Sequence, residues 1–257
     1  MDTRSSDNWE KKPGGWDALQ TELLTFEGDY PILDCKPFEF TNIVNCNNKR
    51  GFNSGSLVST FLDDYHLERF WNRPVHYINR WQSVSGIMSP DFSLLIDMPD
   101  PMQRWQVYRN RLVGYVWQSA GINVVPTVCW SDEKSFEYCF NGIAKNSMVA
   151  VSSIGMVSEW QIPYFQSGFD KMIDVIEPCK ILFMANNKYR HLFNDSRIQW
   201  LDSFFESRRK SWEKDREKEL KDKHYSDKPP GQTKEHNRLP HPRHRKQPRQ
   251  PINRVDK

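Results

Sequence analysis

Short runs of apolar residues alternate along the chain with longer segments in which apolar side chains recur at helical spacing. The short runs predict buried strands, because they are rich in β-branched residues and too short for buried helices. They lie at residues 57–62, 92–96, 122–129, 148–154 and 181–185. A further run, Phe38–Val44, alternates polar and apolar residues, which is typical of an edge strand.

Segments with helical spacing separate the strand-like runs. They span residues 67–81 (interrupted by Pro74), 101–121, 131–142 and 165–176. Pro101 favours a first helical turn and Gly121 a helix end. Repeated strand–helix–strand units predict an α/β fold, with a mostly parallel sheet of five to six strands and helices on both faces. An open doubly wound sheet and a truncated, barrel-like sheet are both compatible with this pattern.

Composition divides the chain into four segments. We expect a flexible N-terminal segment over residues 1–22, an α/β domain over 23–205, a charged helix over 206–223 and a disordered basic tail over 224–257. The helical pattern begins at Arg197, with Ile198 and Leu201 on its apolar side. The tail holds six prolines and four histidines among its basic residues, and it has too few apolar side chains to offset its chain entropy.

Charge is distributed unevenly between these segments. Residues 206–257 hold 17 of the 36 basic and 9 of the 33 acidic residues, a net charge of +8, which leaves −5 for residues 1–205. A disordered basic tail adds salt-dependent affinity for phosphates, whatever the base sequence. The tail therefore predicts contact with a nucleic acid, through Arg243, Arg245, Lys246 and Arg249.

Several classes of protein do not fit the sequence. No run approaches ~18 uncharged apolar residues, so we expect no membrane span. The polar N-terminus lacks the apolar core of a signal peptide, and five cysteines without a CxxC pair indicate neither a disulfide framework nor a zinc site, so we expect a cytoplasmic protein. The absence of GxxxxGK(S/T) and GxGxxG argues against Walker-type ATP use and a dinucleotide fingerprint.

Aspartates stand near the ends of several predicted strands. In parallel α/β folds ligands bind beyond the carboxyl ends of the strands, so Asp64, Asp91 and Asp132 are candidate catalytic groups, and Asp64 and Asp91 candidate ligands of Mg²⁺. Asp64 and Asp132 could equally cap the helices that follow them. Asp91 lies between Pro90 and an apolar run, where a half-buried carboxylate needs a partner such as Arg109 or Arg111.

A phosphorylated substrate would need hydrogen-bond donors and positive charge near the same carboxyl ends of the strands. The turn-rich segment 45–52 supplies Lys49 and Arg50, although an ordinary exposed turn explains it as well. Arg109 and Asn186 complete the candidate substrate-binding residues. The tryptophans lie mostly at helical core spacing, and Cys129 and Cys139 also fit a core setting.

The motifs of the central part of the chain are long and distinctive. Over roughly residues 38 to 187 the chain resembles a domain-of-unknown-function family common in phage, plasmid and integrative-element genomes. The resemblance rests on Thr60–Tyr65, Glu68–Arg69, Trp71–Pro74, Ser89–Ser93, Asp97–Pro99, Trp105, Tyr108–Arg111 and Pro126–Asp132. It implies a mobile-element or accessory setting in a bacterial cytoplasm and supplies no reaction or catalytic residue.

These observations leave three hypotheses. The first is a nucleic-acid-associated accessory protein of a phage or mobile element, based on the basic tail and the resemblance. The second is an enzyme that uses the aspartate rim, with Mg²⁺ as a possible cofactor, on a nucleotide or another phosphorylated substrate. The third is a protein-binding module that acts on a host factor, which no particular residue supports.

Overall fold

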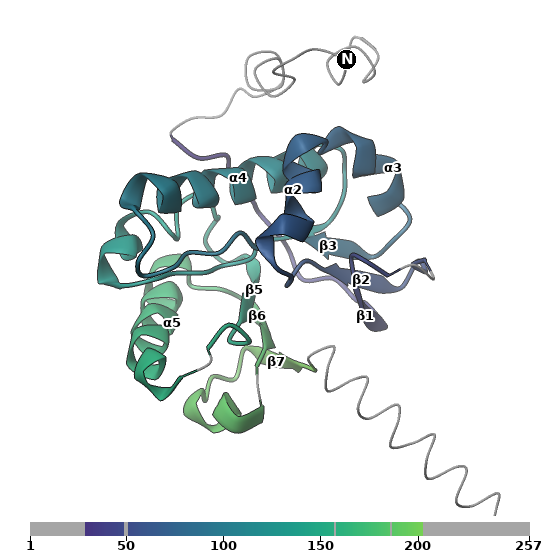
Figure 1. The fold of residues 1–257 in the computed structure, drawn as a ribbon. Coiled ribbons are helices and arrows are strands. Elements are labelled where there is room, and N and C mark those ends of the chain that lie inside the picture. The colour runs from purple at the N-terminus through teal and green to yellow at the C-terminus, as the bar shows by residue number, and fades with distance from the viewer. Residues whose placement is uncertain (1–28, 49–50, 157, 186, 203–257) are drawn as a thin grey trace, which may run out of the picture. The chain divides into compact units, whose positions relative to one another are not determined.

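The computed structural model describes residues 29–48, 51–156, 158–185 and 187–202 (Figure 1). Its strands are β1 (Asn42–Asn45), β2 (Ser56–Ser59), β3 (Gly86–Met88), β4 (Val124–Val125), β5 (Met148–Ser152), β6 (Lys180–Met184) and β7 (Ile198–Leu201). Its α-helices are α2 (Asp64–Asn72), α3 (Ile78–Trp81), α4 (Asp100–Ser119) and α5 (Ile162–Ile176). Short 3₁₀ helices are η1 (Val75–Tyr77), η2 (Glu133–Glu137), η3 (Glu159–Gln161) and η4 (Asn187–Leu192).

Every pair of neighbouring strands runs parallel. The order is β1-β2-β3-β4 in one sheet and β5-β6-β7 in the other. A parallel bridge between Thr127 and Ala150 links the two sheets, with hydrogen bonds of 2.9 Å from Val128 N to Ala150 O and from Ala150 N to Pro126 O. Strand order therefore follows chain order throughout. This is the order of a barrel rather than of a doubly wound sheet, although the described strands do not close into one.

The described helices pack on one side of the strands. Val58, Ile87 and Val124 share a buried cluster with residues of α2 and α4, and Val149 and Phe183 share another with residues of α5. Figure 1 shows α2, α3 and α4 together on the same side of β1, β2 and β3. This arrangement covers one face of the predicted parallel α/β sheet.

The alternate residues of the same strands form a third buried cluster. Leu57, Met88, Val125 and Leu182 pack there with Cys35, and no residue of a described helix takes part. The segment before β1 therefore packs on the face for which the apolar runs also predict helices. A continuous apolar run shows that both faces of a strand are buried, but it does not show what covers them.

Two predicted elements differ in kind from the structure, and the helix predicted over 131–142 is only the short 3₁₀ helix η2. Residues 92–96 form no strand. The strand in this part of the chain is β3, which ends before Pro90. Residues 198–201 form β7 rather than the start of a helix, and they pair in parallel with β6. The apolar positions of so short a segment fit the spacing of a helix or of a strand, and pairing with β6 makes the segment a strand.

The remaining predictions of domain organisation fall largely outside the described residues. These are the segments 1–22, 206–223 and 224–257. Within the described ranges, no helix is long and apolar enough to cross a membrane.

Candidate functional site

A cavity of about 520 Å³ opens beyond the carboxyl ends of β3, β4 and β5. Parallel strands bring the loops that follow them to the same rim, which is where α/β folds bind their ligands. Four stretches line the cavity: one after β3, one after β4, one after β5, and the start of α5 with the preceding η3. The lining residues are Asp91, Ser93–Asp97, Val128–Ser131, Ser152, Gly155, Met156, Trp160, Gln161, Tyr164 and Phe165.

Asp91 is the half-buried carboxylate of this cavity. Its Oδ1 is buried and has no hydrogen-bond partner. Burial, and then the negative charge of Asp64, raise the pKa of Asp91 from 3.8 to about 7, while the positive charge of Arg111 and a hydrogen bond with Thr127 act in the opposite direction. A carboxyl group with this pKa can either give up or accept a proton near neutral pH.

Asp64 supports the loop that carries Asp91 and does not line the cavity. It is the first residue of α2, and its carboxylate accepts hydrogen bonds from Ser93 N at 3.1 Å and from Ser93 Oγ at 2.9 Å. Gln106 Nε2 of α4 donates a third, at 3.0 Å to Oδ2. Asp64 thus ties the loop after β3 to both α2 and α4.

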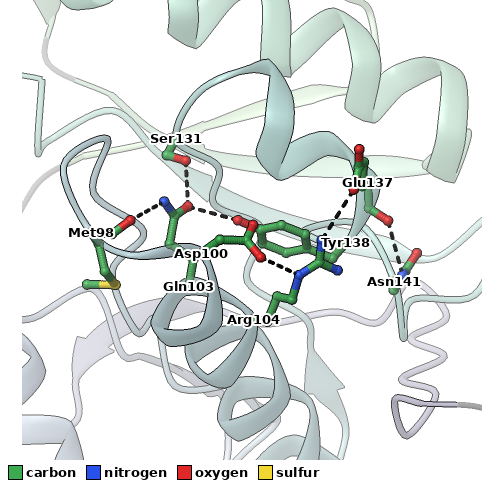
Figure 2. Close-up of polar contacts among 8 residues, drawn as sticks. All are labelled: Met98, Asp100, Gln103, Arg104, Ser131, Glu137, Tyr138 and Asn141. Atoms are coloured by element: carbon green, nitrogen blue, oxygen red, sulfur yellow. Dashed lines mark hydrogen bonds and ion pairs between the residues drawn. The ribbon is translucent and has the colours of Figure 1, made fainter.

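Gln103, also on α4, joins two walls of the cavity (Figure 2). Its Oε1 accepts hydrogen bonds from Ser131 Oγ at 2.6 Å and from Tyr138 Oη at 3.1 Å, and its Nε2 donates to Met98 O at 2.9 Å. Met98 ends the loop after β3, and Ser131 follows β4. One buried amide therefore sets the spacing between these two loops.

A buried arginine, Arg111, hydrogen-bonds to the backbone near Asp91. The guanidinium of Arg111 donates to three backbone carbonyls, those of Asn141, Thr127 and Cys139, at 2.9, 3.1 and 2.8 Å, and to Asn110 Oδ1 at 2.6 Å. Burial lowers the pKa of Arg111 to about 10, so the group still carries its charge at neutral pH. All four acceptors are uncharged, and the carboxyl of Asp91 opposes the effect of burial on the pKa of Arg111 only weakly.

The outer part of the cavity is apolar and aromatic. Trp160 and Tyr164 are 60% and 44% exposed, and their ring centroids lie 6.2 Å apart. Deeper in the cavity, Phe165 packs against Trp130 at 4.9 Å. Gly168 of α5 makes this packing possible, because a Cβ atom there would lie 2.1 Å from the indole Nε1 of Trp130.

The cavity offers an acid–base group but no thiolate and, in its described lining, no cation. Burial raises the pKa of Cys129 well above its usual value, and its Sγ donates to Phe92 O at 3.3 Å, so the thiol stays protonated. The lining holds the carboxylates of Asp91 and Asp97 and no lysine, arginine or histidine. This combination suits a neutral or cationic organic ligand.

Comparison with known proteins places this architecture in a family. The family model described as "Domain of unknown function (DUF4417)" matches residues 29–202. The chain belongs to the DUF4417 family. It is 38% identical over 198 residues to "Gene 1 protein" of Mycobacterium phage L5, covering 74% of this chain and 85% of that protein. It is 35% identical over 217 residues to "Gene 1 protein" of Mycobacterium phage D29, covering 81% of this chain and 80% of that protein. No solved structure matches the chain.

The DUF4417 match confirms the resemblance to an uncharacterised, phage-associated family. It extends past both ends of the range over which the motifs were recognised, and it spans every described strand and helix. The segment from residue 203 onward, which carries the basic excess, lies outside the matched region.

The predicted catalytic aspartates occupy three different positions in this DUF4417 chain. Asp91 lines the cavity and Asp64 lies behind it. Asp132 does not line the cavity, and its Oδ1 accepts a hydrogen bond of 3.2 Å from Lys134 N at the start of η2, as expected of a helix cap.

Of the predicted substrate-binding and nucleic-acid-binding residues, the structure describes only Arg109, which does not line the cavity. Arg109 pairs with Glu68 at 2.7 Å and lies 3.8 Å from the ring centroid of Phe92. It also donates to Gln106 of its own helix. The others lie outside the described residues: Lys49, Arg50, Asn186, Arg243, Arg245, Lys246 and Arg249.

Magnesium binding by Asp64 and Asp91 stays a prediction. No group of three or more histidine, cysteine, aspartate or glutamate side chains gathers around a possible metal position within the described ranges. Both oxygens of Asp64 already accept hydrogen bonds from protein donors. A Mg²⁺ ion at Asp91 would have to complete its shell with water or ligand oxygens.

Sequence reasoning missed the buried amides of α4. Gln103, Gln106 and Asn110 lie on one side of the helix, and all three are buried. Their spacing of three and four residues, in step with Val107, is a signal that the sequence contains. A row of amides within the apolar stripe of a helix indicates that the helix organises a polar site.

Proposed function

We propose that this protein binds a small organic ligand in the cavity at the strand ends and that Asp91 exchanges a proton with it. The observation that carries the proposal is that Asp91 lines the cavity while its buried Oδ1 has no hydrogen-bond partner. A buried acceptor left without a hydrogen bond costs about 1–3 kcal/mol, a cost that a ligand donating to the Asp91 carboxyl group can offset.

Proton transfer is the chemistry that this group suits best. With a pKa of about 7, Asp91 is present in both protonation states at neutral pH and can act as a general base or a general acid. Asp64 contributes by raising the pKa of Asp91 and by holding the loop in place. The protonated thiol of Cys129 plays no nucleophilic part in this scheme.

Ligand retention tests the proposal. The protein is incubated with the small-molecule fraction of a bacterial extract, freed of unbound material, and denatured so that mass spectrometry can identify the released compounds. We expect the wild type to retain one or a few compounds, and Asp91→Asn to retain about tenfold less or worse, because the amide cannot accept a proton and presents donors as well.

The matched control is Glu159→Gln, an exposed carboxylate that pairs with Lys188 and does not line the cavity. This variant should retain the same compounds as the wild type. Equal retention by Asp91→Asn, or no specific retention by the wild type, would contradict the proposal.

The second candidate function is nucleic-acid association through the basic C-terminal part of the chain. Its support is the excess of 17 basic over 9 acidic residues across 206–257. Such an excess favours phosphate contacts by releasing counterions. The family relationship supports an accessory role in a phage or mobile element, and in such a protein both activities can coexist.

Truncation tests this second function separately. Deleting residues 224–257 should weaken binding to a fluorescent DNA or RNA oligonucleotide by about tenfold or more at low salt. Replacing Arg243, Arg245, Lys246 and Arg249 by glutamine should make the dependence of log K on log salt shallower by up to ~3–4. Unchanged anisotropy titrations for both variants would refute a role for the tail.

A further inference from the structure

We infer that the ligand of the strand-end cavity is an amine-bearing nucleobase, bound as the free base or nucleoside rather than as a phosphorylated nucleotide. This inference rests on the proposed function and names its substrate class. It draws on three features of the cavity: its flat apolar surfaces, its hydrogen-bonding groups and its charge.

The first feature is the surface available for stacking. Trp160 and Tyr164 are large rings that stay exposed although they line a cavity. Leu95 and Ile96, from the loop after β3, also line it and are exposed. Exposed apolar side chains that meet around one cavity form a surface with which a flat ring can make contact. Aromatic stacking contributes about 1–3 kcal/mol per base.

The second feature is that the lining holds both a hydrogen-bond acceptor and a hydrogen-bond donor. Oδ1 of Asp91 accepts no hydrogen bond within the protein. Ser152 Oγ accepts one from Ile154 N at 3.2 Å, which leaves its own hydroxyl hydrogen able to donate. Adenine, guanine and cytosine each present amine hydrogens and ring or carbonyl acceptors along one edge. An aliphatic amine would satisfy Asp91 but would leave the aromatic surface unused.

The third feature is the sign of the charge. Asp91 and Asp97 line the cavity without a lysine, arginine or histidine in its described lining. Arg109 and Arg111 of α4, the two arginines that the sequence offered as partners of Asp91, are taken up by Glu68 and by backbone carbonyls. A phosphate group would add negative charge to an already negative site, and the repulsion is strongest where water is excluded. The unphosphorylated form should therefore bind better.

Titration calorimetry on the full-length protein tests the inference. The probes are adenosine, guanosine, cytidine and their 5′-monophosphates, with uridine as the nucleoside that lacks the amine. We expect at least one amine-bearing nucleoside to bind with a Kd below about 100 µM and about tenfold more tightly than its monophosphate and than uridine. Trp160→Ala should weaken that binding by about tenfold through loss of stacking.

Tyr65→Ala is the matched control, because Tyr65 is 69% exposed and does not line the cavity. It should bind the nucleoside as the wild type does. Trp160 is itself well exposed, so its variant should fold, and circular dichroism checks this. Equal or tighter binding of the monophosphate, equal binding of uridine, or no effect of Trp160→Ala would overturn the inference.

The outcomes separate this inference from the proposed function. If no nucleoside binds while the wild type retains an extract compound that Asp91→Asn loses, the nucleobase assignment is wrong and the proposed site stands. If no nucleoside binds and retention does not depend on Asp91, both are wrong.

Discussion

Replacing Arg111 by methionine should lower the free energy of unfolding by about 3–5 kcal/mol, the largest effect that we expect from a single substitution outside the cavity lining. Methionine keeps much of the side-chain volume but donates no hydrogen bond. The carbonyls of Asn141, Thr127 and Cys139 would each lose their guanidinium donor in a region closed to solvent. The change also removes the positive charge that opposes the raised pKa of Asp91.

Urea unfolding, followed by tryptophan fluorescence, measures this effect. Arg104→Met provides the control on the same helix, because Arg104 is partly exposed and makes exposed ion pairs with Asp100 and Glu137, at 2.7 and 3.2 Å. Such pairs contribute about 0–1 kcal/mol. A similar, small loss of stability in both variants would show that Arg111 is not the structural centre that its four hydrogen bonds indicate.

Replacing Asp91 by asparagine should increase stability at pH 8 relative to the wild type, and the gain should shrink towards pH 4. The folded pKa of Asp91 is about 7, above its usual 3.8. Between these values the folded state keeps a proton that the unfolded chain has released, so this group favours folding at low pH and loses that contribution as the pH rises through 7. The raised pKa of Asp91 corresponds to a change of at most about 4 kcal/mol in the free energy of unfolding between pH 3.8 and pH 7.

The measurement is the difference in unfolding free energy between Asp91→Asn and the wild type at several pH values from 4 to 8. Taking the difference cancels the titration of the other carboxylates. Asp97→Asn is the control, because Asp97 lines the same cavity but is exposed. The plot of its unfolding free energy against pH should run parallel to the plot for the wild type. A parallel curve for Asp91→Asn as well would mean that Asp91 ionises as an ordinary surface carboxylate.

The stability gain and the proposed function have one physical origin. A carboxyl group that is unfavourable in the folded protein at pH 8 is one that a ligand can satisfy. Asp91→Asn should therefore be more stable at this pH and yet retain less ligand. Proteins often keep such locally unfavourable groups where they bind or react.

Some features of the site could be predicted from the sequence alone. The helix from Asp100 to Ser119 lies close to its expected limits, because Pro101 and Gly121 mark its ends locally. The burial of Asp91 is predictable because a carboxylate between a proline and an apolar run is at least partly buried. For Asp132 the sequence allows a catalytic group or a helix cap, and the hydrogen bond from Lys134 supports the cap.

Other features could not be predicted from local pattern. The strand after the first helical segment is Gly86–Met88, where three residues are too few to show a period, whereas the more apolar run that follows it forms a cavity wall. The sequence does not distinguish Arg109 from Arg111 as the partner of Asp91. Only the folded chain shows that Arg109 pairs with Glu68, while Arg111 lies close enough to lower the pKa of Asp91.

A parallel α/β domain follows from the amino-acid sequence alone, because the alternation of buried runs and helical stripes is a local property that each segment carries. The family and the contrast between an acidic body and a basic end follow from it as well. The sequential strand order, the cover of the second face of the sheet and the position of Asp91 in an aromatic-lined cavity appear only in the folded chain. These depend on contacts between residues far apart in the chain, such as Thr127 with Ala150 and Gln106 with Asp64, whose energies no local pattern records.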